Sequence, residues 1–354
     1  MHISEGIITG YPAAVYTAGG LALMGLGTWR MKKFAAKFPD KKPLIGMGGA
    51  LIFFVSLIPL PAFTGTCSHP CGTPLIAILL GPAIGIGLAG IALLLQAAFF
   101  AHGGFSTWGA NVFALGFAGC VTGWLTFRGA RKLGLPLWLS GGLAGLLGDI
   151  MVYAVAGLIL AGALVQAPTP QYTFKGYLVA IYAAYLPTQL PIAIGEMVIT
   201  GLALQYCFKQ RPEVLEELGV INQKKTTPIS GLVSLLMVFC LAAIVLLGVA
   251  TPALAEIGPQ TISQPSGHYV LASEPTSGYT GMDEAVNEEM SKKAGIKVRE
   301  PYINLESYGD LWNAMLLLGG GISGFILGRW WHLLFPGNKP AKISSTTSQR
   351  QLNG

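Results

Sequence analysis

Residues 74–101 read PLIAILLGPAIGIGLAGIALLLQAAFFA, an apolar stretch that is interrupted by Gly81-Pro82. About 20 apolar residues suffice to cross a bilayer, so this stretch is too long for one simple span. Because proline breaks a helix, we predict a short helix over 74–80 and a second helix over 84–101. Interrupted segments at membrane depth survive where they line protein or a cavity. The stretch therefore predicts a broken membrane helix beside a binding site.

The composition of the whole chain is typical of a membrane protein. Of its 354 residues, 52% are hydrophobic and 11% are charged, and the mean hydropathy is +0.58. Soluble domains carry about 25% charged residues. The 48 glycines suit closely packed membrane helices. The net charge of +6 gathers in short loops, which indicates cytoplasmic loops rather than a nucleic-acid surface. We therefore predict an all-α, polytopic membrane protein surrounded by lipid.

The basic loops predict how the helices are oriented across the membrane. The densest basic segment, residues 30–42, follows a first predicted span over 11–29. Since such loops stay in the cytoplasm, the N-terminus is predicted to be extracytoplasmic. A second span over 43–63 then returns residues 67–71 to the side of the N-terminus. The broken helix then crosses twice, or dips in and returns. Three later spans are predicted over 109–127, 136–164 and 175–207. The result is a predicted seven-helix bundle in residues 1–207.

The rest of the chain is predicted to form a linker and a smaller membrane unit. Residues 208–227 are a polar cytoplasmic linker, with a short helix that stops at Gly219. Residues 228–332 contain two predicted spans, 229–250 and 311–330, which flank an extracytoplasmic loop over 251–309. Residues 333–354 are a predicted cytoplasmic tail. The alternative to the first of these spans is a signal peptide that is cleaved after Ala255.

The first residues, Met1-His2-Ile3, offer an unusual set of nitrogen atoms. The α-amine, the His2 amide and the His2 imidazole can close fused rings on one metal ion, and His69 is the best candidate for a fourth ligand. A planar set of nitrogens suits Ni(II) or Cu(II). The ligands must lose protons to bind, so the affinity should rise with pH. The alternative is an ordinary frayed terminus.

Two cysteines, Cys67 and Cys71, flank His69. They could form a disulfide, could bind a soft metal together with His69, or could be simple serine-like substitutions. Two carboxylates, Asp149 and Glu196, fall inside predicted spans, where a charge is costly and is a candidate for function. The alternative for Asp149 is a carboxylate satisfied by hydroxyl groups, and the role of Glu196 stays open.

Motifs of soluble catalysts are missing from the sequence. It has no Walker A motif, no His-Glu-x-x-His and no Gly-x-Ser-x-Gly. We therefore predict that the chain is not an enzyme, and that a transporter built on it would use separate ATPases.

Several motifs stand out in the first part of the chain: Met1-His2-Ile3-x-x-Gly6, Ser68-His69-Pro70-x-Gly72-Thr73, the run from Ile78 to Pro82, Leu95-Gln96, and the run from Ala101 to Asn111. They resemble the motifs of the NikM/CbiM family, the substrate-capture components of energy-coupling-factor importers for nickel and cobalt. The resemblance covers about residues 1–207, and residues 228–332 are similar in architecture to the small N component, as in the fused NikMN form.

The resemblance implies a metal site and a function. The implied ligands are the Met1 amine, the His2 amide and imidazole, and His69. Other polar residues would orient these histidines or hold the loop shut, unless they only satisfy the backbone around Gly103-Gly104: Ser68, His102, Thr107 and Asn111. Family members commonly have Ser or Thr in place of Cys67 and Cys71, and this departure puts an all-nitrogen set in doubt.

The implied activity is uptake of Ni2+ across the cell (inner) membrane, with no organic cofactor and with a cytoplasmic C-terminus. The implied partners are a transmembrane coupling protein and ABC ATPase subunits. Uptake of Co2+ for cobalamin synthesis is the alternative cargo, and a membrane metal sensor that does not transport is the alternative from another class.

Overall fold

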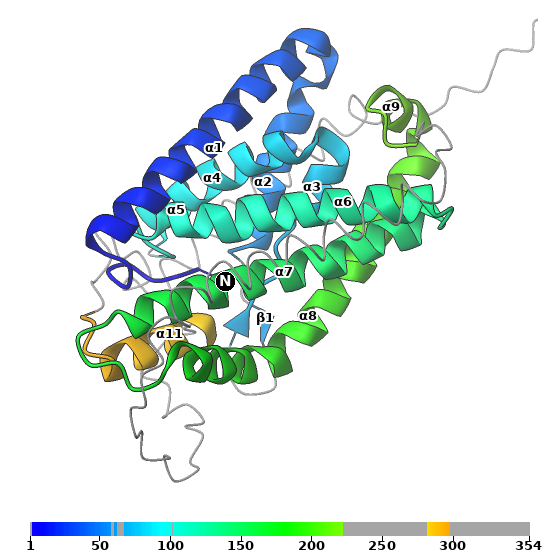
Figure 1. The fold of residues 1–354 in the computed structure, drawn as a ribbon. Coiled ribbons are helices and arrows are strands. Elements are labelled where there is room, and N and C mark those ends of the chain that lie inside the picture. Colours follow the sequence, from blue (N-terminus) through cyan, green and yellow to red (C-terminus); the bar gives the residue numbers. More distant parts are fainter. Residues whose placement is uncertain (1, 58–59, 62–66, 101, 222–281, 298–354) are drawn as a thin grey trace, which may run out of the picture. The chain divides into compact units, whose positions relative to one another are not determined.

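The break within residues 74–101 is present in the computed structural model, where two helices meet at Gly81 (Figure 1). Helix α3 (Thr73–Leu80) ends there and α4 (Pro82–Phe99) begins at the next residue. Gly81 has a φ of +92°, which glycine adopts without strain, and proline is well suited to the first position of the second helix. The predicted short helix followed by a longer one is confirmed.

The structure describes residues 2–57, 60–61, 67–100, 102–221 and 282–297. All of them belong to one unit, Met1–Asn304, and a second unit, Leu305–Gly354, lies outside the described residues. The predicted spans over 229–250 and 311–330 and the cleavage site after Ala255 also lie outside them. The predicted boundaries of the linker and of the two-span unit therefore stay predictions.

The described chain is almost entirely helical, which confirms the all-α prediction. The long helices are α1 (Gly10–Lys37), α4, α7 (Leu137–Val165) and α8 (Phe174–Gln210), together with a continuous segment over 108–132. Four helices within the described residues are long and apolar enough to cross a membrane: Pro82–Phe99, Trp108–Lys132, Leu137–Val165 and Phe174–Gln210. The total of nine spans stays a prediction.

The predicted second span is wrong at its C-terminal end. Helix α2 (Lys42–Val55) ends well before residue 63. Ser56 follows it, and the Ser56 Oγ donates to the carbonyl of Ile52 at 2.6 Å. The chain then forms β1 (Leu60–Pro61), which pairs antiparallel with β2 (Cys67–Ser68). This small ribbon leads directly to His69.

The helical segment over 108–132 is less regular than predicted. It consists of α5 (Trp108–Asn111), a π-helical turn η2 (Val112–Ala118) and α6 (Gly119–Lys132). Such π-helical insertions are frequent at functional sites. Here the insertion begins directly after Asn111. The indole of Trp108 donates to the carbonyl of Gly90 at 3.0 Å, which joins α5 to α4.

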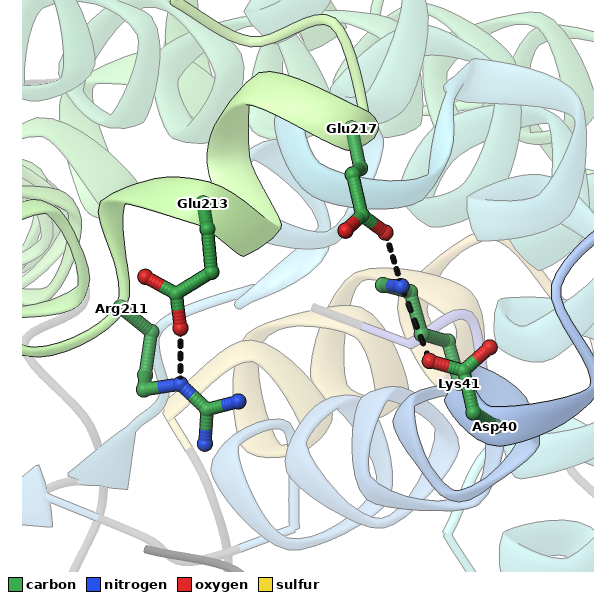
Figure 2. Close-up of polar contacts among 5 residues, drawn as sticks. All are labelled: Asp40, Lys41, Arg211, Glu213 and Glu217. Carbon is green, nitrogen blue, oxygen red and sulfur yellow. Dashed lines mark hydrogen bonds and ion pairs between the residues drawn. The ribbon is translucent and has the colours of Figure 1, made fainter. Parts of the chain in front are cut away.

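The predicted short helix after residue 210 is confirmed as α9 (Pro212–Glu217), and Gly219 stops it with a φ of +72°. Figure 2 shows how α9 is attached to η1 (Pro39–Lys41), the turn between α1 and α2. Lys41 lies 3.0 Å from Asp40 and also pairs with Glu217. The hydrogen bonds to these two carboxylates raise the pKa of Lys41. Arg211 and Glu213 form a second ion pair beside it (Figure 2).

One helix falls inside the predicted polar loop over 251–309. This helix, α11 (Met282–Lys293), was not predicted. It contacts the connection between α7 and α8, where the backbone N–H of Thr169 donates to the carbonyl of Ala294 at 3.1 Å. The side chain of Gln171 donates to the carbonyl of Lys293 at 3.1 Å. At least part of the predicted loop is therefore ordered against the helical bundle.

Candidate metal centre

The N-terminal segment runs into the helical bundle rather than away from it (Figure 1). His2 and Ile3 are both 0% exposed. The Ile3 N–H donates to Asn111 Oδ1 at 2.8 Å, and the Ile3 carbonyl accepts from Thr107 Oγ1 at 2.6 Å and from Asn111 Nδ2 at 3.2 Å. Two side chains thus satisfy the buried backbone of Ile3. This arrangement holds the preceding residue, His2, in one place.

A second pair of contacts anchors the same segment farther along. The Ser106 N–H donates to Glu5 Oε2 at 3.0 Å, and the Gly6 N–H donates to Ser106 Oγ at 3.1 Å. Gly104 is required for this approach because a Cβ there would lie 2.6 Å from the Glu5 Cα. Neither Glu5 nor Ser106 was predicted to be a site residue. A carboxylate within the apolar start of the chain is the signal that could have found Glu5.

Three histidines from three separate segments meet beside this anchored terminus. The ring centroids of His2 and His69 are 5.0 Å apart, those of His2 and His102 are 4.2 Å apart, and those of His69 and His102 are 5.4 Å apart. One nitrogen from each ring can be chosen so that all three lie within 4.8 Å of one another. His2 and His69 are buried and His102 is half-buried. Imidazole nitrogens at this separation can converge on one divalent transition metal.

The electrostatic setting keeps the His2 ring in the form that binds metal. Burial lowers the pKa of His2 well below its usual value, and the neighbouring His102 and His69 lower it further. A neutral imidazole has a lone pair to offer, whereas an imidazolium has none. The site therefore does not need to lose a proton from His2 at neutral pH before metal binds.

The loop that carries His69 is held by α7 and α8. Tyr153 Oη on α7 donates to the His69 carbonyl at 3.4 Å. The Cys71 N–H donates to Glu196 Oε2 at 2.7 Å, and the Gly72 N–H donates to Glu196 Oε1 at 2.9 Å. The Cys71 thiol donates to Asp149 Oδ1 at 3.0 Å. Both intramembrane carboxylates of the sequence analysis thus contact the loop that follows His69.

The structure brings some of the predicted site residues together and places others against the backbone of the N-terminal segment. His2, His69 and His102 come together, and the ring of His102 is closer to that of His2 (4.2 Å) than the ring of His69 is (5.0 Å). Thr107 and Asn111 contact the backbone of Ile3, and Thr107 Oγ1 also lies 3.3 Å from the carbonyl of Gly104. Their predicted role in orienting His2 stays a prediction.

Other predictions are tested less directly. Met1 lies outside the described residues, as do the side chains of Cys67 and Ser68, whose backbone forms β2. Cys71 is a free, buried thiol that faces Asp149. No disulfide forms at this cysteine in the described structure, and its hydrogen bond favours a structural role.

Comparisons with known proteins show the family of the chain. The family described as "CbiM: Cobalt uptake substrate-specific transmembrane region" matches residues 2–214. The chain is 36% identical over 337 residues to "Cobalt transport protein CbiM" of Geobacter sulfurreducens, which covers 94% of this chain and 90% of the relative. It is 38% identical over 223 residues to the protein of that name from Sorangium cellulosum, which covers 63% of this chain and 97% of the relative.

A solved structure gives the same indication. A crystal structure of a "transition metal transporter" is similar with a TM-score of 0.50 and 29% identity, and the similarity covers 59% of this chain and 93% of that chain.

Proposed function

Because this chain belongs to the CbiM family of cobalt uptake transmembrane proteins, we propose that it captures divalent cobalt for import through a site built on His2, His69 and His102. The observation that carries the proposal is the meeting of three imidazoles, drawn from three segments, beside a buried N-terminal segment. The predicted Met1 amine is the further nitrogen ligand in this proposal. His102 joins the ligands instead of only orienting them.

The choice of cobalt over nickel departs from the sequence-based preference. The relatives reported above are named for cobalt transport. A set of three imidazoles and an amine need not be planar, and Co(II) accepts such a geometry readily, whereas a planar chelate by the terminus would favour Ni(II). Nickel is therefore the second candidate cargo, and it is favoured by the position of His2 directly after the terminal amine.

Partners and placement complete the proposal. The chain works with a transmembrane coupling protein and ABC ATPase subunits, which hydrolyse ATP on its behalf. It lies in the cell membrane with its N-terminus outside and its C-terminus inside, an orientation supported by the basic residues of segment 30–42. Residues 1–207 form the capture domain and residues 228–332 a fused accessory unit. The relatives support this division, because one aligns over 94% of the chain and another over 63%.

The proposal is tested by titrating Co2+ and Ni2+ into the purified full chain in detergent. The wild type is compared with His69→Ala, His102→Ala and a form that carries one extra residue before Met1. We expect tighter binding of Co2+ than of Ni2+, and loss of at least tenfold in affinity in each altered form. Undiminished binding by His69→Ala would exclude this site. Full binding by the extended form would exclude only the terminal amine.

Cellular uptake separates transport from sensing. Cells that express the chain with its partner genes should accumulate radioactive cobalt, and the His69→Ala variant should not. Metal binding by the wild type without any accumulation would favour the membrane metal sensor.

A further inference from the structure

The two backbone amides that follow Pro70 share a single acceptor. The N–H groups of Cys71 and Gly72 donate to the two oxygens of the Glu196 carboxylate, at 2.7 and 2.9 Å. Glu196 lies on α8, is 3% exposed, and is more than 120 residues away in the sequence. Both Glu196 oxygens thus accept backbone N–H groups in a buried setting, where a lost hydrogen bond is costly. This geometry ties one helix firmly to the His69 loop.

The start of α3 explains why the loop needs such a partner. The first amides of a helix have no acceptor within the helix, and a side chain at the N-cap normally supplies one. Here the N-cap is Gly72, which has a φ of +67° and no side chain. Glu196 instead accepts the N–H groups of Gly72 and of the preceding Cys71, so it fixes the entry of the chain into α3 from a distant helix.

Further contacts bind the same loop to α7. The Cys71 thiol donates to Asp149 Oδ1 at 3.0 Å, and Gln189 of α8 donates to the other Asp149 oxygen. Tyr153 Oη reaches the His69 carbonyl at 3.4 Å. Three of the four residues from His69 to Gly72 are thus held by α7 or α8.

This cluster is better suited to hydrogen bonding than to a second metal ion. Donor atoms of Cys71, Asp149 and Glu196 do lie within 4.8 Å of one another. However, the Cys71 thiol and both oxygens of each carboxylate already take part in hydrogen bonds among the described residues. A cation would have to break these contacts, so we interpret the cluster as one that holds the loop. We call the Glu196 carboxylate together with the N–H groups of Cys71 and Gly72 the clamp.

We propose that Glu196 is a positioning residue that holds His69 in its metal-binding place, and that release of the metal begins when α8 moves and this clamp opens. The inference rests on the proposed function, because it gives His69 the role of a ligand. Only one residue, Pro70, separates His69 from the first clamped amide, so a shift of Glu196 is transmitted directly to the ligand.

The structure of α8 is suited to such a movement. Pro187 and Pro191 lie inside the helix, shortly before Glu196. Each proline removes one backbone hydrogen bond from the helix interior and favours a bend there. The clamp residue therefore follows the part of α8 that is least restrained by its own backbone.

The test compares Glu196→Gln with the wild type and with Glu216→Gln, a matched change at an exposed residue of α9. The first readout is hydrogen exchange of the peptide that contains the amides of Cys71 and Gly72. The second is the rate of Co2+ release from the full chain into an excess of chelator. Glu196→Gln replaces one acceptor oxygen with an amide that faces a backbone N–H. We expect about tenfold faster exchange and release, which corresponds to about 1.4 kcal/mol, and no change in Glu216→Gln.

The outcomes separate the clamp from the metal site. Unchanged exchange in Glu196→Gln would overturn the clamp, and so would unchanged Co2+ release in a variant whose loop exchanges faster. The absorption spectrum of bound Co2+ should stay that of the wild type, since the ligands are the same. If His69→Ala still binds Co2+ fully, the proposed metal site fails instead. Glu196→Asp, which keeps the charge but shortens the reach, replaces Glu196→Gln if the latter does not fold, and it should give an intermediate release rate.

Discussion

Asn111 is the residue through which the docked terminus can be tested most sharply. Replacing it with leucine, which has the same number and branching of side-chain heavy atoms, leaves the Ile3 N–H buried without its 2.8 Å acceptor. A buried donor without a partner costs about 1–3 kcal/mol. Since tenfold in affinity corresponds to about 1.4 kcal/mol, Co2+ binding should weaken by about 5-fold to 150-fold. The physical reason is that the segment that carries His2 must be docked for metal to bind.

Thr107→Val should have a smaller effect at the same place. It removes the 2.6 Å bond to the Ile3 carbonyl, but Asn111 Nδ2 still donates to that oxygen at 3.2 Å. A loss of about 1 kcal/mol, or about fivefold in affinity, is expected. In the double variant the carbonyl loses both donors. The combined effect should therefore exceed the product of the two single effects, as expected of side chains that share one partner.

The assay is calorimetric titration of Co2+ into each purified variant, together with its thermal unfolding. Thr122→Val on α6 is the matched control, because the Thr122 side chain is buried and its hydroxyl has no hydrogen-bond partner in the described part of the chain. Its affinity should stay within twofold of the wild type. An Asn111→Leu variant that folds and also binds Co2+ within twofold of the wild type would refute the reasoning.

Three other perturbations follow from the same structure. Because the pKa of His2 is already low, the pH dependence of Co2+ affinity between pH 6.5 and 8 should come from the Met1 amine, with a rise of up to about tenfold per pH unit; a flat titration curve would exclude the amine as a ligand. Cys71→Ser keeps a donor for Asp149, so the measured Co2+ affinity should change by less than about threefold. A large loss of affinity would instead indicate that the Cys71 thiol is a metal ligand. Gly109→Ala places a Cβ 2.2 Å from the backbone of Tyr16 and should lower the free energy of unfolding by about 1–3 kcal/mol or more, whereas Gly25→Ala, which meets nothing within 4 Å, should be neutral or stabilising in thermal melts.

Some helix boundaries could be predicted from the sequence because they depend on the local chemistry of single residues, and others could not. The helix break at Gly81-Pro82 follows from local chemistry, because φ and the loss of an N–H are properties of the residues themselves. The end of α2 was misplaced because apolar residues continue beyond Val55, and composition alone does not distinguish a helix from a β-ribbon there. The π-helical turn after Asn111 has no counterpart in periodicity.

Within the site, the limits of prediction concern contacts between distant segments. Proximity of His2 to His69 could be inferred because both were placed on one side of a membrane. The close approach of His102 to both rings, and the pairing of Glu5 with Ser106, depend on side-chain packing that no spacing in the sequence encodes. Glu196 could be recognised only as an expensive buried charge, since its partners lie more than 120 residues away.

The docking of residues 2–8 also bears on the order in which this protein can mature. These residues are synthesised well before their partners, and the Ile3 N–H has no acceptor until Asn111 has been made, 108 positions later. The loop that carries His69 must likewise wait for Glu196, 125 positions after Cys71. During synthesis, His2 therefore lacks its final neighbours for most of the time that translation of the bundle takes. Competence to hold a metal arises only near the end of translation of this bundle, so a nascent chain that stalls before α8 lacks the contacts that complete the site.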